Sequence, residues 1–337
     1  MDICVCGAQV PFSRGGAELH MDNLVAALRA AGHRADLIRL PVAWDRHRAL
    51  DAALAWRMVP VDADLVIATN FPSYFVRHPR KVVWLFHQHR SAYDAADMPW
   101  SDFIHEDAAL EDQRLLADWD TRVLEEAERL YTTSGVVADR LLRFNGLRAT
   151  PLYHPPPLYQ ELHPGRSGDF VFCATRLEAN KRPDLMIEGI AGSRSGVRLV
   201  VAGSGSLESE LRSLAKRLSA SDKVDLAGFL PDDELVRHYA DALAVMYTPF
   251  DEDYGYVTLQ AFFAAKPVIT TKDAGGVLEW VEDGVTGLVT DGTPAALGEA
   301  IDRLAADPAL ARRMGEAGHE RVRNLEWPSV VDRLLRS

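Results

Sequence analysis

At 337 residues the chain is long for a single hydrophobic core, and it predicts two domains of ordinary size. A hydrophobic content of 47% and a charged content of 26% are typical of a globular protein and exclude a disordered one. The formal net charge of -12 argues against a surface that binds nucleic acid, although a pocket within an acidic protein can still be basic.

Cysteine usage and the lack of long apolar runs set expectations about location and metals. The three cysteines, Cys4, Cys6 and Cys173, have no framework spacing, which is typical of a reducing compartment. The sequence has no CxxC or HExxH pattern, so no structural zinc site is expected. It opens without a leader-like segment and contains no run of about 18 apolar residues. We therefore expect a cytoplasmic protein.

The first half of the chain alternates between short apolar runs and helical patterns. The apolar runs predict parallel strands, covered on both faces, at residues 2–6, 35–40, 64–69, 81–86 and 130–134. Helical patterns cover about residues 17–31 and 105–129, and a third ends at about Asn145. Gly32 follows the first helix where glycine commonly ends one, and Asn145-Gly146 is a turn signal.

A segment rich in proline and glycine, YHPPPLYQELHPGRSG at residues 153–168, interrupts this alternation. Three consecutive prolines cannot continue a helix or a strand, so the segment predicts an interdomain linker. Strands are then predicted at residues 170–174, 198–202, 223–229, 244–248, 267–271 and 287–289. The whole pattern predicts two α/β halves with parallel sheets, and a ligand between them at the carboxyl ends of the strands.

Two strand-end loops of the first half carry candidate site residues. Gly15 and Gly16, in SRGGAE, follow the first strand and open a helix, where glycine lets the backbone approach a phosphate or a sugar. The loop lacks GxGxxG, so an NAD site has little support, and a plain flexible turn is the alternative. His87 directly follows the strand at residues 81–86 and is a candidate pocket wall. It could form a metal pair with His89, but no neighbouring carboxylate favours that.

The corresponding loops of the second half are basic or rich in glycine. Arg176 and Lys181 follow the strand at residues 170–174 and could converge on one anion. The planar guanidinium of arginine and the compact ammonium of lysine together suit a diphosphate. Solvated surface charge is the alternative. Gly203, in a Gly-Ser-Gly turn, and Gly228-Phe229 are weaker candidates for nucleotide contacts. Each signal is weak alone, and the shared place of these residues after strands is the stronger observation.

The most informative segment is TPFDEDYGYVTLQAFFAAK, at residues 248–266. Its Glu252 could accept hydrogen bonds from sugar hydroxyls. The run Tyr254, Gly255, Tyr256 and Val257 leads into a helical pattern, and the first N–H groups of a helix are ready to bind phosphate. Gln260, eight positions after Glu252, could reach a nucleotide ribose. The alternative is an acidic loop that caps an ordinary core helix, because acidic residues favour helix starts.

Taken in chain order, these motifs resemble those of the retaining glycosyltransferases of family 4, which have the GT-B fold. The motifs are GGAE, a histidine after a mid-chain strand, R-x4-K, GSG, GF, EDYGYVTLQ and DAGG. The resemblance covers nearly the whole chain and is most specific at residues 248–276. It implies two Rossmann-like domains that face each other across a cleft. The acceptor side would be residues 1–160, joined by a C-terminal helix at 325–337, and the donor side residues 165–324.

The resemblance also implies a substrate and a role for each site residue. The donor would be a nucleotide-diphosphate sugar of UDP or GDP type, used with retention of configuration and with neither a metal nor another cofactor. Arg176 and Lys181 would stabilise the departing diphosphate, and Glu252 would hold the donor sugar. His87 would line the anomeric centre, and Gly15-Gly16 would close over the phosphate or acceptor side. The acceptor would be a glycan or lipid-linked saccharide in bacterial surface polysaccharide assembly.

One position departs from the family pattern. The motif E-x7-E usually ends in glutamate, and Gln260 stands there in this sequence. An amide still accepts a hydrogen bond from ribose, but without charge assistance, so donor affinity or nucleotide preference would change. The departure keeps open a nucleotide-sugar-binding protein with weak or no transferase activity. A sugar-nucleotide epimerase, which needs no acceptor, is a further alternative.

A basic cluster raises the question of membrane contact. Arg77, Arg80 and Lys81 could meet anionic lipid on the inner face of a membrane, where enzymes of this family often glycosylate lipid-linked acceptors. Three basic residues in five are more often a solvated face.

Overall fold

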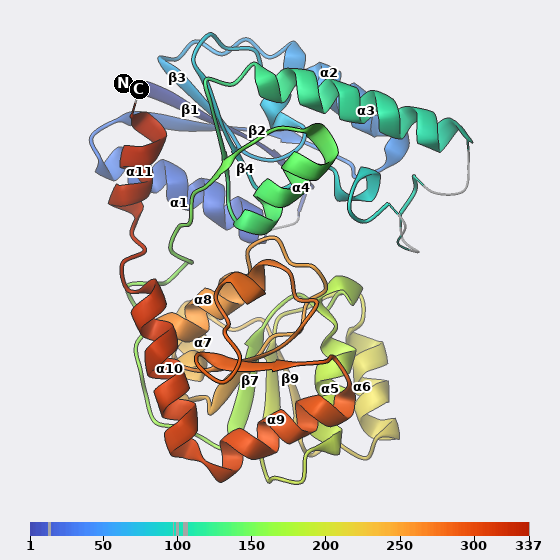
Figure 1. Cartoon of the computed structure of the whole chain (residues 1–337), viewed down its shortest axis with the longest axis vertical. Helices are drawn as coiled ribbons and strands as arrows, with labels where there is room; N and C mark the ends of the chain where they lie inside the picture. The colour runs from blue at the N-terminus through green and yellow to red at the C-terminus, as the bar shows by residue number, and fades with distance from the viewer. Residues whose placement is uncertain (13–14, 97, 99–100, 104–106, 337) are drawn as a thin grey trace. The chain divides into compact units, whose positions relative to one another are not determined.

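The computed structural model describes residues 1–12, 15–96, 98, 101–103 and 107–336. They form two compact units. The N-terminal unit comprises Met1–His154 and the chain from Glu326 onward, and the C-terminal unit comprises Pro155–Leu325. Each unit is built on a six-stranded sheet in which all recorded strand pairs are parallel (Figure 1).

The sheet of the N-terminal unit has the strand order β2-β1-β3-β4-β5-β6. Its strands are β1 (Asp2–Gln9), β2 (Arg34–Pro41), β3 (Leu65–Ala68), β4 (Lys81–Leu85), β5 (Arg129–Thr132) and β6 (Thr150–Pro151). Its helices are α1 (Gly16–Ala30), α2 (Arg46–Arg57), α3 (Asp107–Glu125), α4 (Gly135–Asn145) and, from the end of the chain, α11 (Trp327–Leu335). Helix α11 packs against α1, so the last helix belongs to the first unit.

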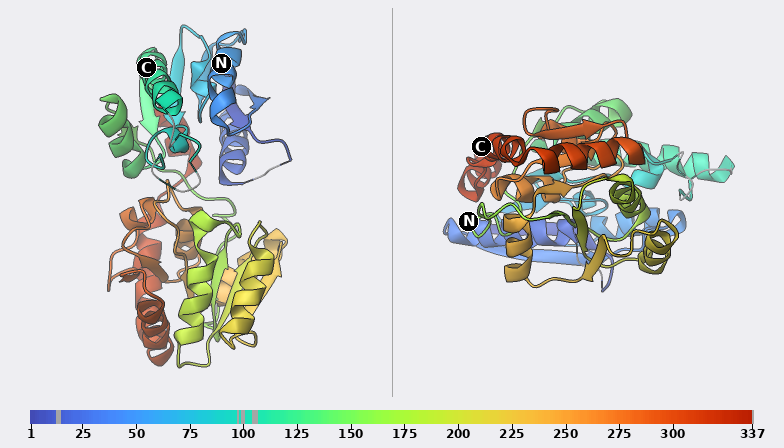
Figure 2. Two further views of the ribbon diagram at one scale, coloured as in Figure 1. Left: turned by 90° about the vertical axis from the view of Figure 1, so that its right-hand side faces the viewer. Right: turned by 90° about the horizontal axis from the view of Figure 1, so that it is seen from below.

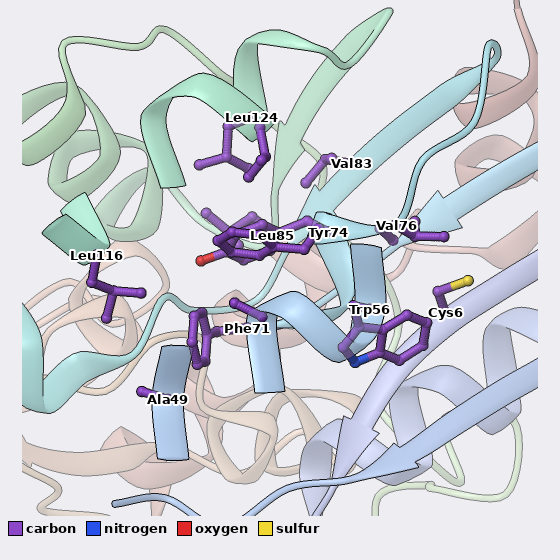
Figure 3. Close-up of a cluster of buried hydrophobic side chains, with 14 of the residues drawn as sticks. Cys6, Ala49, Trp56, Phe71, Tyr74, Val76, Val83, Leu85, Leu116 and Leu124 are labelled. Atoms are coloured by element: carbon purple, nitrogen blue, oxygen red, sulfur yellow. The ribbon is translucent and has the colours of Figure 1, made fainter. Parts of the chain in front are cut away.

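Alternation along β4 explains how this sheet is buried on both faces. Val83 and Leu85 point into the apolar cluster that α2 and α3 cover, which contains Trp56 and is drawn in Figure 3. The intervening Trp84 instead contacts His20 of α1. Successive side chains of a strand point to opposite faces, so a continuous apolar run is what a doubly covered strand requires.

The C-terminal unit repeats the design with the strand order β12-β11-β10-β7-β8-β9. Its strands are β7 (Phe170–Ala174), β8 (Arg198–Ala202), β9 (Val224–Gly228), β10 (Ala244–Met246), β11 (Val268–Thr271) and β12 (Gly287–Thr290). Its helices are α5 (Pro183–Gly192), α6 (Glu208–Arg217), α7 (Asp232–Asp241), α8 (Tyr256–Phe263), α9 (Pro294–Ala306) and α10 (Pro308–Val322). Helix α5 packs against α6 and α9, whereas α8 packs against α10 (Figure 2).

The predicted strands are all present, and β7 and β8 have the predicted bounds. Strand β1 continues to Gln9 instead of ending at residue 6, because β2 pairs with it along its whole length. Helix α2 was not predicted, although Asp45 caps it by accepting a hydrogen bond from the Arg48 amide at 3.1 Å. The turn signal at Asn145-Gly146 is confirmed, since Gly146 ends α4 in the left-handed conformation.

The prediction that Lys81 belongs to an exposed basic cluster is wrong. Its side chain is fully buried, and its ammonium donates to the carbonyls of Tyr74 and Val123, at 3.1 and 2.8 Å, and to Glu126 at 3.1 Å. The apolar run of β4 begins at this residue, so its stem is drawn into the core. Only Arg77 and Arg80 of the cluster are exposed. Among the described residues, no helix has the length and apolar character needed to cross a bilayer.

Candidate active site

Two loops of the C-terminal unit start where its strand order reverses. From β7 the chain proceeds to β8 on one side, and from the neighbouring β10 it proceeds to β11 on the other. In open parallel sheets, the crevice beyond the carboxyl ends of the strands at such a reversal is the usual ligand site. The loop after β7 carries Arg176 and Lys181, and the loop after β10 carries Glu252.

Lys181, Tyr247 and Glu252 form one hydrogen-bonded trio at this reversal. The Lys181 ammonium pairs with the Glu252 carboxylate, and its Nζ also lies 3.4 Å from the hydroxyl oxygen of Tyr247. That hydroxyl donates to the same carboxylate oxygen at 2.7 Å. The side chains of Lys181 and Glu252 are 13% and 16% exposed, so the pair is largely withdrawn from water but retains some contact with it.

Burial and neighbouring charges set the protonation of Glu252 and Tyr247 at neutral pH. Burial works to raise the pKa of Glu252, but the Lys181 charge and the hydrogen bond from Tyr247 outweigh it, and the pKa lies below its usual value. Burial and the Glu252 charge both raise the pKa of Tyr247 well above its usual value. The carboxyl group is therefore ionised, and the phenol keeps its proton and donates it.

Arg182, the residue after Lys181, ties three strand-end loops together. Its guanidinium makes two parallel hydrogen bonds to Asp273, at 2.9 and 2.7 Å. It also donates to the carbonyls of Thr248 and Pro249, at 2.7 and 2.8 Å, and to the hydroxyl of Thr271 at 2.8 Å. A guanidinium is planar and its N–H groups point in fixed directions, so it holds its partners in one geometry. Arg182 therefore fixes the positions of the loops after β7, β10 and β11 relative to one another.

Two glycines of these loops are required by close backbone approach. Gly275 has φ +63°, and a Cβ there would lie 2.6 Å from the backbone nitrogen and oxygen of Glu252. Gly203 has φ +130°, and a Cβ there would lie 2.0 Å from the carbonyl oxygen of Thr175. Gly203, predicted as a nucleotide contact, therefore has a close partner within the protein itself, the loop after β7.

Helix α8 begins directly after the acidic loop. Gly255 is its N-cap, with φ +80° in the left-handed region that favours glycine. The first N–H groups of a helix have no acceptor inside it, so the anion-binding role predicted for Gly255, Tyr256 and Val257 has the backbone geometry that it needs. The rings of Tyr254 and Tyr256 meet edge to face, with centroids 5.6 Å apart.

Arg176, Gly228 and Phe229 are predicted site residues that, within the described part of the chain, form no hydrogen bond or ion pair with the trio. Arg176 is exposed, and no hydrogen bond or ion pair links it to another described residue of the chain. Gly228 is the last residue of β9, the edge strand of the sheet, and Phe229, which follows it, is 84% exposed. The structure thus joins Lys181 to Glu252 and leaves Arg176 unattached.

Gln260 lies inside α8 and already has two partners. Its side chain is buried; the carbonyl oxygen accepts from the Tyr239 hydroxyl at 2.9 Å, and the NH₂ group donates to the Pro157 carbonyl at 3.3 Å. A ribose hydroxyl would have to share or displace one of these bonds. The predicted ribose contact stays a prediction.

In the N-terminal unit, His87 stands half-buried just after β4. Its Nδ1 lies 2.8 Å from the carbonyl oxygen of Gln88. A carbonyl can only accept, so Nδ1 carries the proton and, in the neutral ring, Nε2 is an acceptor. His87 also meets the ring of Trp44 edge to face, with centroids 5.9 Å apart.

His89 is a core residue. It stacks with Trp44 and Phe71, with centroids 5.6 and 5.3 Å apart, and burial lowers its pKa to about 4. Within the described ranges, no three histidine, cysteine or acidic side chains gather as a metal site would require.

The predicted glycine loop after β1 is described only in part, because Ser13 and Arg14 lie outside the described residues. Gly15 is the N-cap of α1 in extended conformation, and its N–H donates to the Glu18 carboxylate at 2.7 Å. Gly16 is the exposed first residue of that helix. The loop therefore opens a helix as predicted, without a left-handed residue at Gly15.

Sequence reasoning missed Tyr247 and Arg182. Tyr247 directly follows β10, so its place after a strand was the available signal. Arg182 precedes Pro183, the first residue of α5, and proline at that position is a helix-start signal. Neither signal distinguishes a side chain that reaches into the site from one that faces solvent.

A hollow of about 640 Å³ lies at the opposite edge of the same sheet. It is lined in part by Asp169, Val197 and Leu243, which precede β7, β8 and β10. None of the predicted site residues is among its lining residues. The predicted site residues of this unit therefore lie away from the hollow.

Comparison with solved structures identifies the fold. The sucrose-phosphate synthase of Thermosynechococcus elongatus superposes with a TM-score of 0.78 at 18% identity, covering 99% of this chain and 97% of that one. An Anabaena protein, HepE, solved with UDP and glucose, gives 0.75 at 16% identity, covering 99% and 98%. These likenesses show the fold, and the predicted GT-B fold is confirmed.

Sequence comparison identifies the family. Residues 161–321 match the family model described as glycosyl transferases group 1. The D-inositol 3-phosphate glycosyltransferase of Acidothermus cellulolyticus is 30% identical over 240 residues, which is 63% of this chain and 53% of that protein. A GDP-mannose-dependent phosphatidylinositol monomannoside mannosyltransferase of Mycolicibacterium smegmatis is 33% identical over 176 residues, or 49% and 46%. The matches thus span about half the length of these relatives. The resemblance read from the motifs is confirmed, and residues 161–321 carry the match to the group 1 glycosyltransferases.

Proposed function

We propose that this protein is a retaining, metal-independent glycosyltransferase that moves a sugar from a nucleotide-diphosphate sugar to a hydroxyl group. The observation that carries the proposal is the ion pair of Lys181 and Glu252, held with Tyr247 where the strand order reverses. A cation and a sugar-binding carboxylate side by side suit a donor with an anionic end and a hydroxylated end.

The proposed mechanism is electrostatic. Lys181, with Arg176 as a second cation, would neutralise the charge that develops on the leaving diphosphate, and the first amides of α8 would add to this. Removing one such preorganised donor typically lowers kcat by about 10²–10³-fold. Glu252 would hold the sugar hydroxyls, and His87 would line the anomeric centre through its free Nε2 acceptor.

The relatives support the substrate classes. One is GDP-mannose-dependent and another was solved with UDP and glucose, which supports a donor of UDP or GDP type. The names of relatives that act on inositol phosphate or phosphatidylinositol mannoside support a polyol, glycan or lipid-linked acceptor, as in bacterial surface polysaccharide assembly. Such a reaction would run in the cytoplasm, peripherally at a membrane where the acceptor is a lipid.

Donor turnover in Arg176→Ala and Lys181→Ala tests the proposal. A thermal-shift screen of UDP- and GDP-sugars first identifies the donor, because a bound ligand raises the melting temperature. Arg212→Ala is the matched control, since Arg212 forms an exposed ion pair with Glu208 on α6. We expect transfer to fall about 100-fold or more in Lys181→Ala and to persist in the control. Near-wild-type rates in both site variants would refute the proposal.

The glutamine at position 260 favours one alternative, a nucleotide-sugar-binding protein with little or no transferase activity. Calorimetric binding of a nucleotide sugar, with no product from any acceptor tested, would support it. Interconversion of the donor sugar without an acceptor, followed by NMR, would instead indicate an epimerase.

A further inference from the structure

The side chain of Gln260 bridges two parts of the C-terminal unit that are distant in sequence. Its NH₂ group donates to the carbonyl of Pro157, 103 positions earlier, at 3.3 Å, and its carbonyl accepts from Tyr239 at 2.9 Å. Tyr239 is fully buried, and Gln260 is 7% exposed. Pro157 belongs to the segment through which the chain enters this unit, which starts at Pro155.

The chemistry of the partners requires an amide at position 260. The Pro157 carbonyl can only accept, so the atom that faces it must be a donor, which also fixes the orientation of the amide. An ionised glutamate has no donor and would set a buried negative charge against a carbonyl oxygen. The glutamine that replaces the usual glutamate therefore makes a bond that an ionised glutamate cannot make.

A second anchor lies just before the proline run. His154 is the last residue of the first segment of the N-terminal unit, and its Nε2 lies 2.7 Å from Nδ1 of His20. Both histidines are buried. Between this anchor and Pro157 stand only Pro155 and Pro156, whose rings fix φ near about −65°. The covalent connection is thus held at both ends and is stiff between them.

We propose that Gln260 is a positioning residue that fastens this interdomain connection to the C-terminal unit, and that the role requires an amide in place of a carboxylate. The consequence for sugar transfer rests on the proposed function. Because the bond acts on the connection and not on the donor, losing it should lower turnover without tightening donor binding.

Hydrogen exchange tests the anchor independently of activity. The reporters are the amides of Glu161 and Leu162, which donate to the Leu158 carbonyl just after the proline run, at 3.0 Å each. Relative to wild type at pH 7.5, we expect about ten-fold faster exchange in Gln260→Glu and Gln260→Met, since a buried acceptor loses its donor. Tyr239→Phe is the control, because it spares the bond to Pro157, and should change exchange by less than about three-fold.

The pH dependence separates anchoring from general destabilisation. Burial raises the pKa of a carboxyl group, so at pH 5 the glutamate of Gln260→Glu should be protonated in part and donate again. Its exchange should then return toward wild type, while Gln260→Met stays fast. Wild-type exchange in Gln260→Glu at pH 7.5 would overturn the proposal, as would an equal effect of Tyr239→Phe.

Calorimetry with UDP and GDP adds the functional comparison. We expect Gln260→Glu to bind nucleotide no more tightly than wild type. Tighter binding together with wild-type exchange would assign position 260 to the ribose and overturn the anchor. If wild type binds neither nucleotide, the proposed function fails, and the exchange comparison still decides whether Gln260 holds the connection.

Discussion

The candidate site residues at the carboxyl edges of the two sheets have different surroundings. After β4 in the N-terminal unit, a half-buried histidine adjoins a neutral stack of Trp44, His89 and Phe71. After β7 and β10 in the C-terminal unit, charged side chains pair across loops, Lys181 with Glu252 and, close by, Arg182 with Asp273. Both edges end six parallel strands. The same framework therefore supports different chemistry through its loops.

This difference agrees with the proposed division of labour. The charged edge of the C-terminal unit suits a diphosphate. The two units also differ in the role of a lysine. Lys81 of the N-terminal unit is a buried structural cation, and Lys181 of the C-terminal unit lies at the loop edge beside a carboxylate.

The largest stability effect should come from Lys81→Met. The change leaves the buried carbonyls of Tyr74 and Val123 without a donor, so we expect a loss of about 3 kcal/mol or more in the stability of the N-terminal unit. Thermal unfolding with hydrogen exchange measures the loss in each unit. Nucleotide affinity should be unchanged in protein that stays folded. A comparable loss in the C-terminal unit would break the separation between the two lysines.

Arg182→Ala should come next, with a loss of about 2–3 kcal/mol in the C-terminal unit. The variant removes hydrogen bonds to Asp273 and to two carbonyls. The loss of stability is reduced because Asp273 is half exposed and water screens its ion pair with Arg182. We also expect weaker nucleotide binding, since the loops lose their common tie. Arg182→Lys keeps the charge but not the fork, and should restore little of either property. Full rescue by lysine would show that charge alone is needed.

Acid should destabilise the N-terminal unit before the C-terminal one. Burial lowers the pKa of His89 to about 4 and that of His154 to about 3, below about 6.5 for an unfolded histidine. The unfolded chain thus binds more protons below pH 6.5, and His89 alone should cost about 2 kcal/mol at pH 5.

In the C-terminal unit, the pKa shift of Glu252 preserves stability down to a lower pH. Its pKa is lowered, so its stabilising contribution is complete above about pH 4.3 and is lost only below that.

Unfolding followed by hydrogen exchange at pH 7.5, 6 and 5 measures both units. His89→Phe should remove about 2 kcal/mol of the acid sensitivity at pH 5. Equal acid sensitivity of the units would contradict the contrast between the two edges.

The smallest stability effect should come from Arg176→Ala, within about 0.5 kcal/mol, because the side chain is exposed. Its transfer rate should nevertheless fall if it serves as the second cation. Melting temperature and turnover measured on the same preparation check this pair of outcomes. A large loss of stability would show that Arg176 has a structural partner after all.

Much of the fold follows from local pattern. Apolar runs such as residues 170–174 and 198–202 predicted strands with their correct ends, because a strand covered on both faces must be apolar throughout. Helix α2 was missed, since its charged residues hide the apolar stripe of Ala49, Ala53 and Trp56 that reaches the core. The order of strand-end motifs was enough to recognise the family.

The sequence by itself determined which residues stand at the strand ends and which chemical groups they carry there. Only the tertiary structure decided which of those groups meet: Lys181 with Glu252, Arg182 with Asp273, and Gln260 with Pro157. It also decided that Lys81 is buried. The physical reason is that strand position depends on local periodicity. The three contacts, and that of Lys81 with Glu126, instead join groups at least 40 positions apart and depend on loop geometry and on desolvation.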